Sequence, residues 1–244
     1  MPEVGAGADL AELILAALDG ERLHGGQVVA IAHTVVSKAE GSVRSLSGVR
    51  PGERARALAA EQGKDPRIVQ VVLEESAEVL RAQAGVIVSR TPHGFVCANA
   101  GVDASNAGEA AAGETVILLP RDPDRSARTI RARLRELGAE PPPAVLISDT
   151  FGRAWRHGQT DVALGLAGLQ PLDDWRGRSD ADGLALQATW LAVADAAAGA
   201  ADLARAKDSR EPVVLLEGLE RFITLEDGPG AAALIRPLSE DLFR

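Results

Sequence analysis

Short apolar runs alternate with amphipathic segments along most of this chain, and that alternation constrains the fold more than any other feature. Buried strands are predicted from the apolar runs at residues 27–32, 144–148 and 213–216. Amphipathic helices are predicted at residues 9–18, with Asp9 as the N-cap, at 53–62 and at 126–138, with Ser126 as the cap. Because the two kinds of element interleave without a strict repeat, we predict a mixed α/β (α+β) fold rather than a doubly wound sheet.

The remaining segments are assigned by turn signals and periodicity. Residues 34–38 continue the first strand and bring Lys38 toward its end. Pro66 is favourable at the first position of a helix that we expect to run over 65–82. We further predict a hairpin from 86–88 and 95–97, a strand at 115–119, a tightly packed glycine-rich segment at 161–169 and a long alanine-rich helix at 184–207.

Composition limits the class of protein. The chain has 244 residues, of which 46% are hydrophobic and only 3% aromatic, so we expect one module over residues 1–244 with an aliphatic core. A net charge of −9 argues against a nucleic-acid-binding surface. No apolar run approaches the roughly 20 residues of a membrane span, so we expect a cytoplasmic protein. Cys97 is the only cysteine, which excludes a disulfide framework and a cysteine zinc site.

One oxygen-rich turn lies at residues 99–106, where Asp103 is followed by Ser105 and Asn106. Magnesium and manganese prefer oxygen ligands and commonly use one or two carboxylates together with phosphate oxygens. The alternative is an Asx-type turn, in which these side chains only satisfy backbone groups. Local composition leaves both interpretations of Asp103 open.

A second such turn follows the apolar run at 144–148 and contains Asp149 and Thr150. Ligands bind at the carboxyl ends of strands in open α/β sheets, and a threonine hydroxyl beside an aspartate is typical of cation sites in phosphoryl transfer. The alternative is that Asp149 or Thr150 caps a turn.

Several other polar residues are weaker candidates. Lys38, Arg153 and Arg156 can bind anions, although single basic residues are more often solvated. Glu75 lies near the apolar stripe of its predicted helix and is a candidate base, while His93 is better explained by turn chemistry.

Five segments together resemble one family, the coenzyme F420 gamma-glutamyl ligases, which append L-glutamate to a deazaflavin cofactor. They are residues 34–41, 72–76, 99–106, 149–156 and 158–161, in family order over nearly the whole chain. The most specific are Gly-Val-Asp-Ala-Ser-Asn, which ends at Asn106, and Asp-Thr-Phe-Gly-Arg, which begins at Asp149.

The resemblance implies an intertwined homodimer that uses GTP, L-glutamate and a coenzyme F420 precursor, with Mg²⁺ or Mn²⁺, two ions per site, and K⁺ as a further candidate. On the family pattern Asp103 and Asp149 hold one cation and Thr150 contributes to a second. Lys38, Asp103 and Asp149 are the implied catalytic residues. The implied nucleotide contacts are Pro2, Glu3, Val4, His33, Thr34, Lys38, Asn106, Ala206, Lys207 and Asp208.

Two departures from the pattern bear on the site. The family has a strand before a Gly-Leu-Pro loop that contacts GTP, so Pro2, Glu3 and Val4 are expected to be the remainder of that loop without the strand. Lys207 stands near the position where some members have an acidic ligand of the second cation, and a phosphate contact is its alternative role.

Two alternative functions use the same residues. One is a metal-dependent phosphohydrolase built on Asp103 and Asp149, and the other is a GTP- or deazaflavin-binding relative without activity.

Overall fold

The computed structural model describes residues 1–18, 20–104, 114–206 and 208–241. Helices are α1 (Leu10–Ala17), α2 (His33–Ala39), α3 (Glu53–Gln62), α4 (Pro66–Glu74), α5 (Pro123–Glu136) and α6 (Val193–Ala204). The first strands are β1 (Val28–Ala32), β2 (Val43–Ser45), β3 (Glu78–Gln83), β4 (Val86–Arg90), β5 (Val96–Ala98) and β6 (Thr115–Ile117). The later strands are β7 (Ala144–Arg153), β8 (Arg156–Ala167), β9 (Asp173–Asp174), β10 (Trp190–Leu191) and β11 (Val213–Leu216).

The larger part of the molecule, here called the large-sheet end, is built on a four-stranded sheet in the order β11-β1-β7-β8. Strand β1 pairs parallel with β7 and antiparallel with β11, while β7 and β8 form a long antiparallel hairpin. Parallel and antiparallel pairs in one sheet, with helices on both faces, agree with the predicted mixed α/β class.

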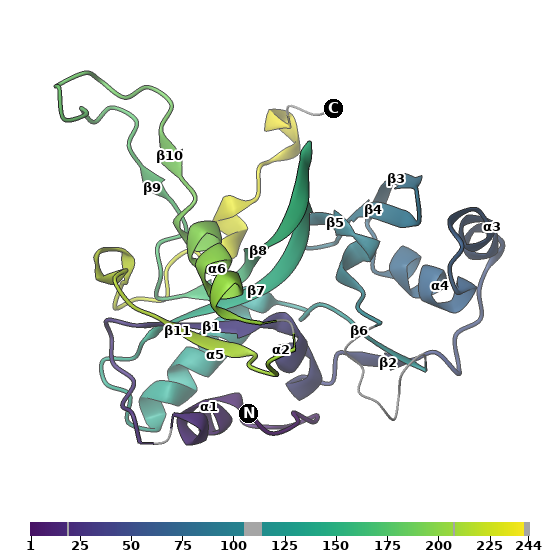
Figure 1. Ribbon diagram of the computed structural model, residues 1–244, viewed down its shortest axis with the longest axis horizontal. Coiled ribbons are helices and arrows are strands. Elements are labelled where there is room, and N and C mark those ends of the chain that lie inside the picture. Colours follow the sequence, from purple (N-terminus) through teal and green to yellow (C-terminus); the bar gives the residue numbers. More distant parts are fainter. Residues whose placement is uncertain (19, 105–113, 207, 242–244) are drawn as a thin grey trace.

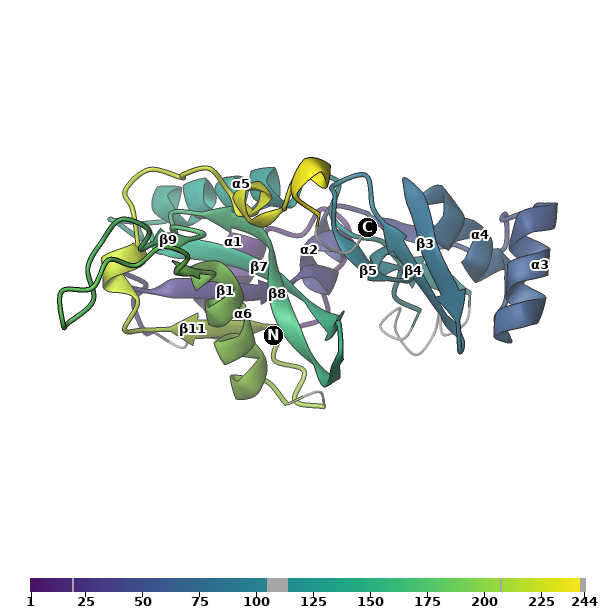
Figure 2. The ribbon, with the colours of Figure 1, turned by 90° about the horizontal axis from the view of Figure 1, so that it is seen from above.

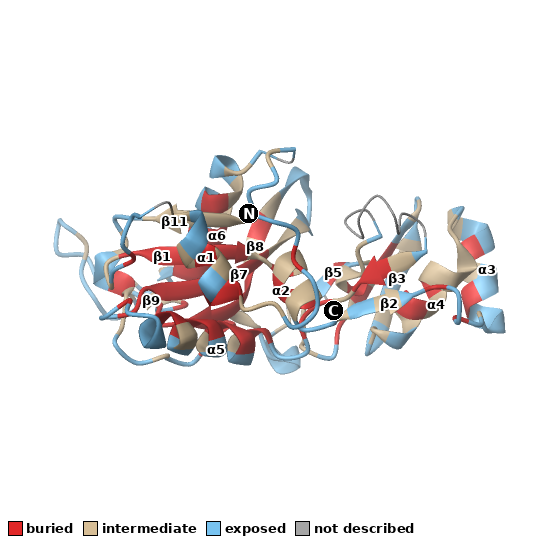
Figure 3. Cartoon of the chain, turned by 90° about the horizontal axis from the view of Figure 1, so that it is seen from below, coloured by how far each residue is buried: buried red, intermediate tan, exposed pale blue. Residues whose placement is uncertain are grey.

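Alternation along β1 determines what covers each face of this sheet. Val29 and Ile31 face a cluster that includes side chains of α1 and α5, whereas Val28 and Ala30 face alanines of α6. All four side chains are fully buried, as Figure 3 shows for the strand as a whole. The core is aliphatic, as the composition predicts.

The smaller part, here called the hairpin end, contains α3, α4 and the three-stranded sheet β3-β4-β5. Its helices pack on Ile87 of β4 and on Ala100, which follows β5. Figure 2 shows the two ends side by side along the longest axis, with α2 at the junction between them.

Three predicted elements are confirmed with small shifts. The strands at 27–32 and 213–216 correspond to β1 and β11, and residues 86–90 and 96–98 pair as a hairpin. Asp9 caps α1 as predicted, since its carboxylate accepts from Ala11 N and Glu12 N. Gly165 of β8 lies against α5 so closely that a Cβ there would stand 2.2 Å from the Pro123 carbonyl oxygen, which explains the small residues at 161–169.

The prediction of strand at 34–38 is wrong. The chain turns into α2 directly after Ala32, and His33, Val36 and Ser37 are buried with helical spacing. The β-branched residues Thr34, Val35 and Val36 suggested a strand, but β propensity depends on the neighbours available, and β1 already ends at Ala32.

The predicted helices at 65–82 and 184–207 are too long. Helix α4 ends at Glu74, because residues 78–83 pair with β4 and tertiary pairing outweighs their helical propensity. Residues 190–191 form β10 with β9, and only α6 is helical in the second region.

Two further details differ from expectation. The N-cap of α5 is Asp122 rather than Ser126, since Asp122 Oδ1 accepts from Arg125 N at 3.0 Å. Strand β7 continues to Arg153, so Asp149 lies within the strand, although just past its parallel pairing with β1. The longest described helix has 14 residues, and none in the described part of the chain is long and apolar enough to cross a bilayer.

Candidate functional site

A cavity of about 1020 Å³ opens at the junction of the two ends of the molecule. Its walls come from the N-terminal residues 1–4, the start of α2, the segment around Asp103, the middle of the β7–β8 hairpin, and the segment after α6, where Asp202, Arg205, Ala206 and residues 210–212 line it. The cavity therefore collects segments from five separate parts of the sequence.

Asp149 and His33 lie together because β1 and β7 run parallel. The last pair of that ladder is Ala32 with Ser148, so the next residue of each chain segment reaches the same edge. His33 Nε2 lies 3.4 Å from Asp149 Oδ1, and the same oxygen accepts from Thr150 N at 2.8 Å. The imidazole is 3% exposed and the carboxylate 21%, so of these two lining residues Asp149 is the more open to the cavity.

Asp103 reaches the cavity through an unusual turn after β5. Asn99, Ala100 and Gly101 all have positive φ, between 52° and 71°. Such conformations are costly outside glycine and asparagine and often occur at functional sites. Asp103 is then fixed by two backbone hydrogen bonds with Ile117, at 2.9 and 2.8 Å.

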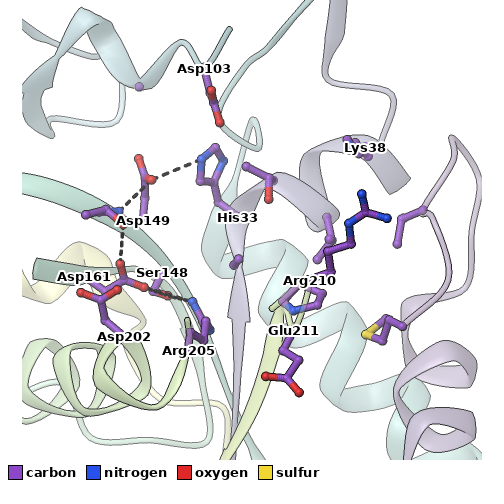
Figure 4. Close-up of a pocket in the computed structure, with 18 of the residues that line it drawn as sticks. His33, Lys38, Asp103, Ser148, Asp149, Asp161, Asp202, Arg205, Arg210 and Glu211 are labelled. Carbon is purple, nitrogen blue, oxygen red and sulfur yellow. Dashed lines mark hydrogen bonds and ion pairs between the residues drawn. The ribbon is translucent and has the colours of Figure 1, made fainter. Parts of the chain in front are cut away.

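Asp103 and Asp149 line the same cavity although they come from different ends of the molecule. Figure 4 shows both residues next to the His33 ring, with Asp103 above it and Asp149 beside it. The structure thus brings together the two oxygen-rich turns that the sequence singled out.

Thr150, the third predicted metal ligand, also lines the cavity and leads to residues that sequence reasoning missed. Its hydroxyl donates to Asp161 Oδ1 at 2.7 Å, and Ser148 Oγ donates to Asp161 Oδ2 at 2.7 Å. Arg205 Nη1 donates to Asp161 Oδ2 at 3.1 Å. The sequence does place Asp161 directly before an apolar run, at the end of segment 158–161, which resembles the family. That position could have indicated a site residue.

Two cations lie across the cavity from Asp149, on the side that also carries the carboxylate of Glu211. Lys38 on α2 and Arg210 both line the cavity, and Figure 4 places them on the side away from Asp149 and Asp161. Arg210 was not predicted, and it too has a positive φ, of 56°. A cavity lined by both carboxylates and cations suits a polyanion bound together with metal ions.

Most of the predicted nucleotide contacts line this cavity. They are Pro2, Glu3, Val4, His33, Thr34, Lys38 and Ala206. Val4 is nevertheless buried in the core beside α1, so its side chain has a packing role. Asp208 does not line the cavity, and Asn106 and Lys207 lie outside the described residues.

The weaker candidates lie elsewhere. Arg153 and Arg156 are at the exposed tip of the β7–β8 hairpin, where Arg153 Nη2 donates to the His157 carbonyl. Glu75 is the C-cap of α4, and His93 contacts the Arg121 carbonyl oxygen at 3.0 Å, which fits a role in the turn.

Cys97 can be excluded as a nucleophile at neutral pH. Burial, with a smaller contribution from the charge of Asp149, raises the pKa of its thiol to about 12. The thiol therefore stays protonated, as expected for a small buried apolar residue.

The donor set fits a hard cation that is completed by a ligand. No three His, Cys, Asp or Glu side chains in the described ranges are grouped to hold a metal by themselves. Two carboxylates and a hydroxyl leave coordination positions open, which suits Mg²⁺ or Mn²⁺ bound jointly by protein and phosphate oxygens.

The sequence profile described as F420-0:Gamma-glutamyl ligase matches residues 1–218. The chain belongs to this family. The coenzyme F420:L-glutamate ligase of Methanothermobacter thermautotrophicus is 45% identical over 247 residues, which cover 100% of this chain and 96% of that protein. The protein of the same name from Methanopyrus kandleri is 45% identical over 245 residues, 99% of this chain and 94% of that protein.

A third relative, the coenzyme F420:L-glutamate ligase of Haloarcula marismortui, is 41% identical over 252 residues, which cover 100% of this chain and 93% of that protein. Membership in the F420-0:gamma-glutamyl ligase family confirms the resemblance carried by the Asp103 and Asp149 motifs.

Proposed function

We propose that this chain is a GTP-dependent ligase that joins L-glutamate to a coenzyme F420 precursor through a γ-glutamyl amide bond. The family and the names of its relatives support the glutamate-ligase part of the proposal. The observation that carries the rest is that Asp103 and Asp149, distant in sequence, line one cavity together with Lys38.

Amide formation from a carboxylate needs an activated acid. In the proposed reaction the terminal carboxylate of the precursor attacks the γ-phosphorus of GTP, forming an acyl phosphate and releasing GDP. The amine of glutamate then attacks the acyl carbon, loses a proton, and expels inorganic phosphate. Each step leaves negative charge on a departing phosphate group, first GDP and then inorganic phosphate, so positioning and charge neutralisation are the main demands on the protein.

Asp103 and Asp149 would hold one Mg²⁺ or Mn²⁺, and Thr150 would contribute its hydroxyl oxygen to a second. When bound, these ions neutralise phosphate oxygens and polarise the phosphorus. His33 Nε2 contacts Asp149 Oδ1 and so helps to hold the direction of that carboxylate. K⁺ is a further ion that we propose could bind near these carboxylates.

Lys38 and Arg210, which both line the cavity, are proposed to bind the nucleotide phosphates. Lysine acts as a point charge on phosphate, and arginine can donate two parallel hydrogen bonds. Thr34, the backbone of residues 2–4, Asn106 and residues 206–208 complete the proposed nucleotide contacts. We also propose that the active form is a homodimer.

The proposal is tested by incubating the purified protein with GTP, Mn²⁺, L-glutamate and the deazaflavin precursor, followed by mass spectrometry of the deazaflavin. The expected result is a mass increase of one or more glutamyl units that requires all four components. Asp149→Asn is expected to abolish the product, and Asp195→Asn, at a position outside the cavity lining and outside the proposed contacts, to retain it.

Two other outcomes would contradict the proposal. Phosphate release without glutamate would favour a metal-dependent phosphohydrolase. Tight binding of GTP or the deazaflavin with no turnover would favour an inactive relative.

A further inference from the structure

The carboxylate of Asp161 is the most deeply buried acidic group at the cavity wall. Its side chain is 3% exposed, and it lies on β8 directly across from Thr150 of β7. Three donors bind it, namely the hydroxyls of Thr150 and Ser148 and the guanidinium of Arg205. A buried charge with its hydrogen bonds satisfied in this way is held in one orientation.

The two carboxylate oxygens have different partners. Oδ1 accepts from Thr150 Oγ1 at 2.7 Å, whereas Oδ2 accepts from Ser148 Oγ and Arg205 Nη1. Because the Thr150 hydroxyl gives its only proton to Oδ1, its oxygen can act toward the cavity only as an acceptor or as a ligand.

Arg205 also holds the Asp161 carboxylate in its orientation. Its side chain is 10% exposed, and Nη1 donates to Ser148 Oγ at 3.3 Å as well as to Asp161. Among the described residues, its Nε and Nη2 are buried without hydrogen-bond partners. Asp161 is the carboxylate with which Arg205 forms its ion pair, at 3.1 Å. The Oδ2 position is therefore surrounded by donors, and only an oxygen acceptor suits it.

We propose that Asp161 is a positioning residue that turns the Thr150 hydroxyl so that its oxygen, and not its proton, faces a bound cation. This inference rests on the proposed function, in which Thr150 is a cation ligand. Asp161 itself does not touch the cation in this arrangement. Its effect on metal binding passes through Thr150 alone.

The variant Asp161→Asn tests the inference because the amide can be placed in only one way. Arg205 and Ser148 require the amide oxygen at the Oδ2 position, so the NH₂ group faces Thr150. The Thr150 oxygen must then accept from that NH₂ group, which competes with a cation for the same lone pairs. We expect the affinity for Mn²⁺, measured by electron paramagnetic resonance of free Mn²⁺ in the presence of GTP, to fall about 10- to 100-fold.

The matched control is Asp195→Asn, which replaces a half-buried aspartate whose carboxylate contacts β8. Asp195 accepts from Ala163 N and does not line the cavity. Its Mn²⁺ affinity is expected to equal that of the wild type.

A double-mutant cycle separates positioning from a general structural effect. In a Thr150→Val background there is no hydroxyl to orient, so adding Asp161→Asn should not weaken Mn²⁺ binding further. In a Thr150→Ser background, which keeps a hydroxyl, Asp161→Asn should still weaken it. Equal losses in the wild-type and Thr150→Val backgrounds would overturn the inference.

The single variant Thr150→Val distinguishes failure of the inference from failure of the proposed function. Unchanged Mn²⁺ affinity in Thr150→Val would remove Thr150 from the proposed ligand set. Weaker binding in Thr150→Val with wild-type binding in Asp161→Asn would leave the ligand set standing and overturn the role of Asp161. If Asp161→Asn does not fold, Asp161→Leu with Arg205→Met removes both buried charges together and is expected to give the same loss of affinity.

Discussion

His33 Nε2 lies 3.4 Å from Asp149 Oδ1, at the edge where β1 and β7 end their parallel pairing. His33 is a predicted nucleotide contact that lines the cavity, and its ring, which is 3% exposed, also lies against the Asp149 carboxylate. Nδ1 of the same ring lies 3.5 Å from Ser37 Oγ, which holds the ring from within α2.

We expect His33→Asn to weaken Mn²⁺ binding about 10-fold, because residues that orient metal ligands typically contribute 10- to 100-fold to affinity. We expect the smaller value of this range of affinity changes because 3.4 Å is long for a hydrogen bond. Titration of Mn²⁺ in the presence of GTP measures the effect. His157→Asn on the exposed hairpin tip is the control, and an equal loss there would contradict the assignment.

Lys38→Ala should raise the KM for GTP by roughly 10- to 150-fold, because a hydrogen bond to a charged group is worth about 1.5–3 kcal/mol. Lys64→Ala is a suitable control, since Lys64 is equally half-buried but does not line the cavity. Steady-state kinetics at varied GTP measures both. An unchanged KM in Lys38→Ala would remove Lys38 from the nucleotide site.

Gly101→Ala should disturb the turn that presents Asp103. Gly101 has a φ of 71°, and a Cβ there would stand 2.6 Å from Leu119 Cγ. Gly41 has nearly the same φ, 72°, with open space around its Cβ position. Both variants should lose about 1–2 kcal/mol from left-handed strain, and Gly101→Ala roughly 1–3 kcal/mol more from overpacking.

The two glycine variants are compared by urea denaturation and by Mn²⁺ titration. Gly101→Ala should also lose Mn²⁺ affinity, while Gly41→Ala should keep it. Equal stability and equal affinity in the pair would show that contact with Leu119 is unimportant.

Asp195 should make stability depend on pH. Burial raises the pKa of its carboxyl above the ordinary value of 3.8, outweighing the hydrogen bond from Ala163 N. The folded state therefore binds the proton more tightly than the unfolded state, and stability falls as pH rises from 3.8 through the folded pKa. Asp195→Asn removes this loss while keeping an oxygen acceptor for Ala163 N.

We therefore expect Asp195→Asn to raise the melting temperature at pH 7.5 and to raise it less as the pH is lowered toward 3.8. Differential scanning calorimetry over that range measures the difference. An advantage that is the same at every pH would show that ionisation of Asp195 is not its source.

Arg131 joins α5 to the segment after β11 and should matter for stability. Its guanidinium is 4% exposed and donates to the carbonyl oxygens of Pro143, Thr224 and Leu225 as well as to Asp227. Arg131→Met leaves these acceptors without their donor and should cost about 3–5 kcal/mol, a fall in melting temperature of roughly 6–20 °C. Arg135→Met on the exposed face of α5 should change it little.

The apolar strands and the ligand turns could be predicted from the sequence because their signals are local. Val28–Ala32 is uniformly apolar, and Asp149 follows a similar run directly. The helical state of residues 33–39 could not be predicted, because it depends on where β1 finds its last partner. The same holds for β3, which is a strand only because β4 pairs with it.

Asp161 was missed for a related reason. Its donors Ser148 and Arg205 are 13 and 44 residues away, so no local spacing connects them. Asp103 and Asp149 were predicted to meet only through their family motifs, because nothing in their spacing indicates that the turn after β5 faces β7.

The cavity is lined by Asp149 of β7, in the large-sheet end, and by Asp103, in the segment that follows β5 of the hairpin end. An ion held by both carboxylates would therefore connect the large-sheet end to the hairpin end. Binding of the proposed nucleotide and metal would then be coupled to the relative placement of the two ends, and together they would stabilise one arrangement of the molecule.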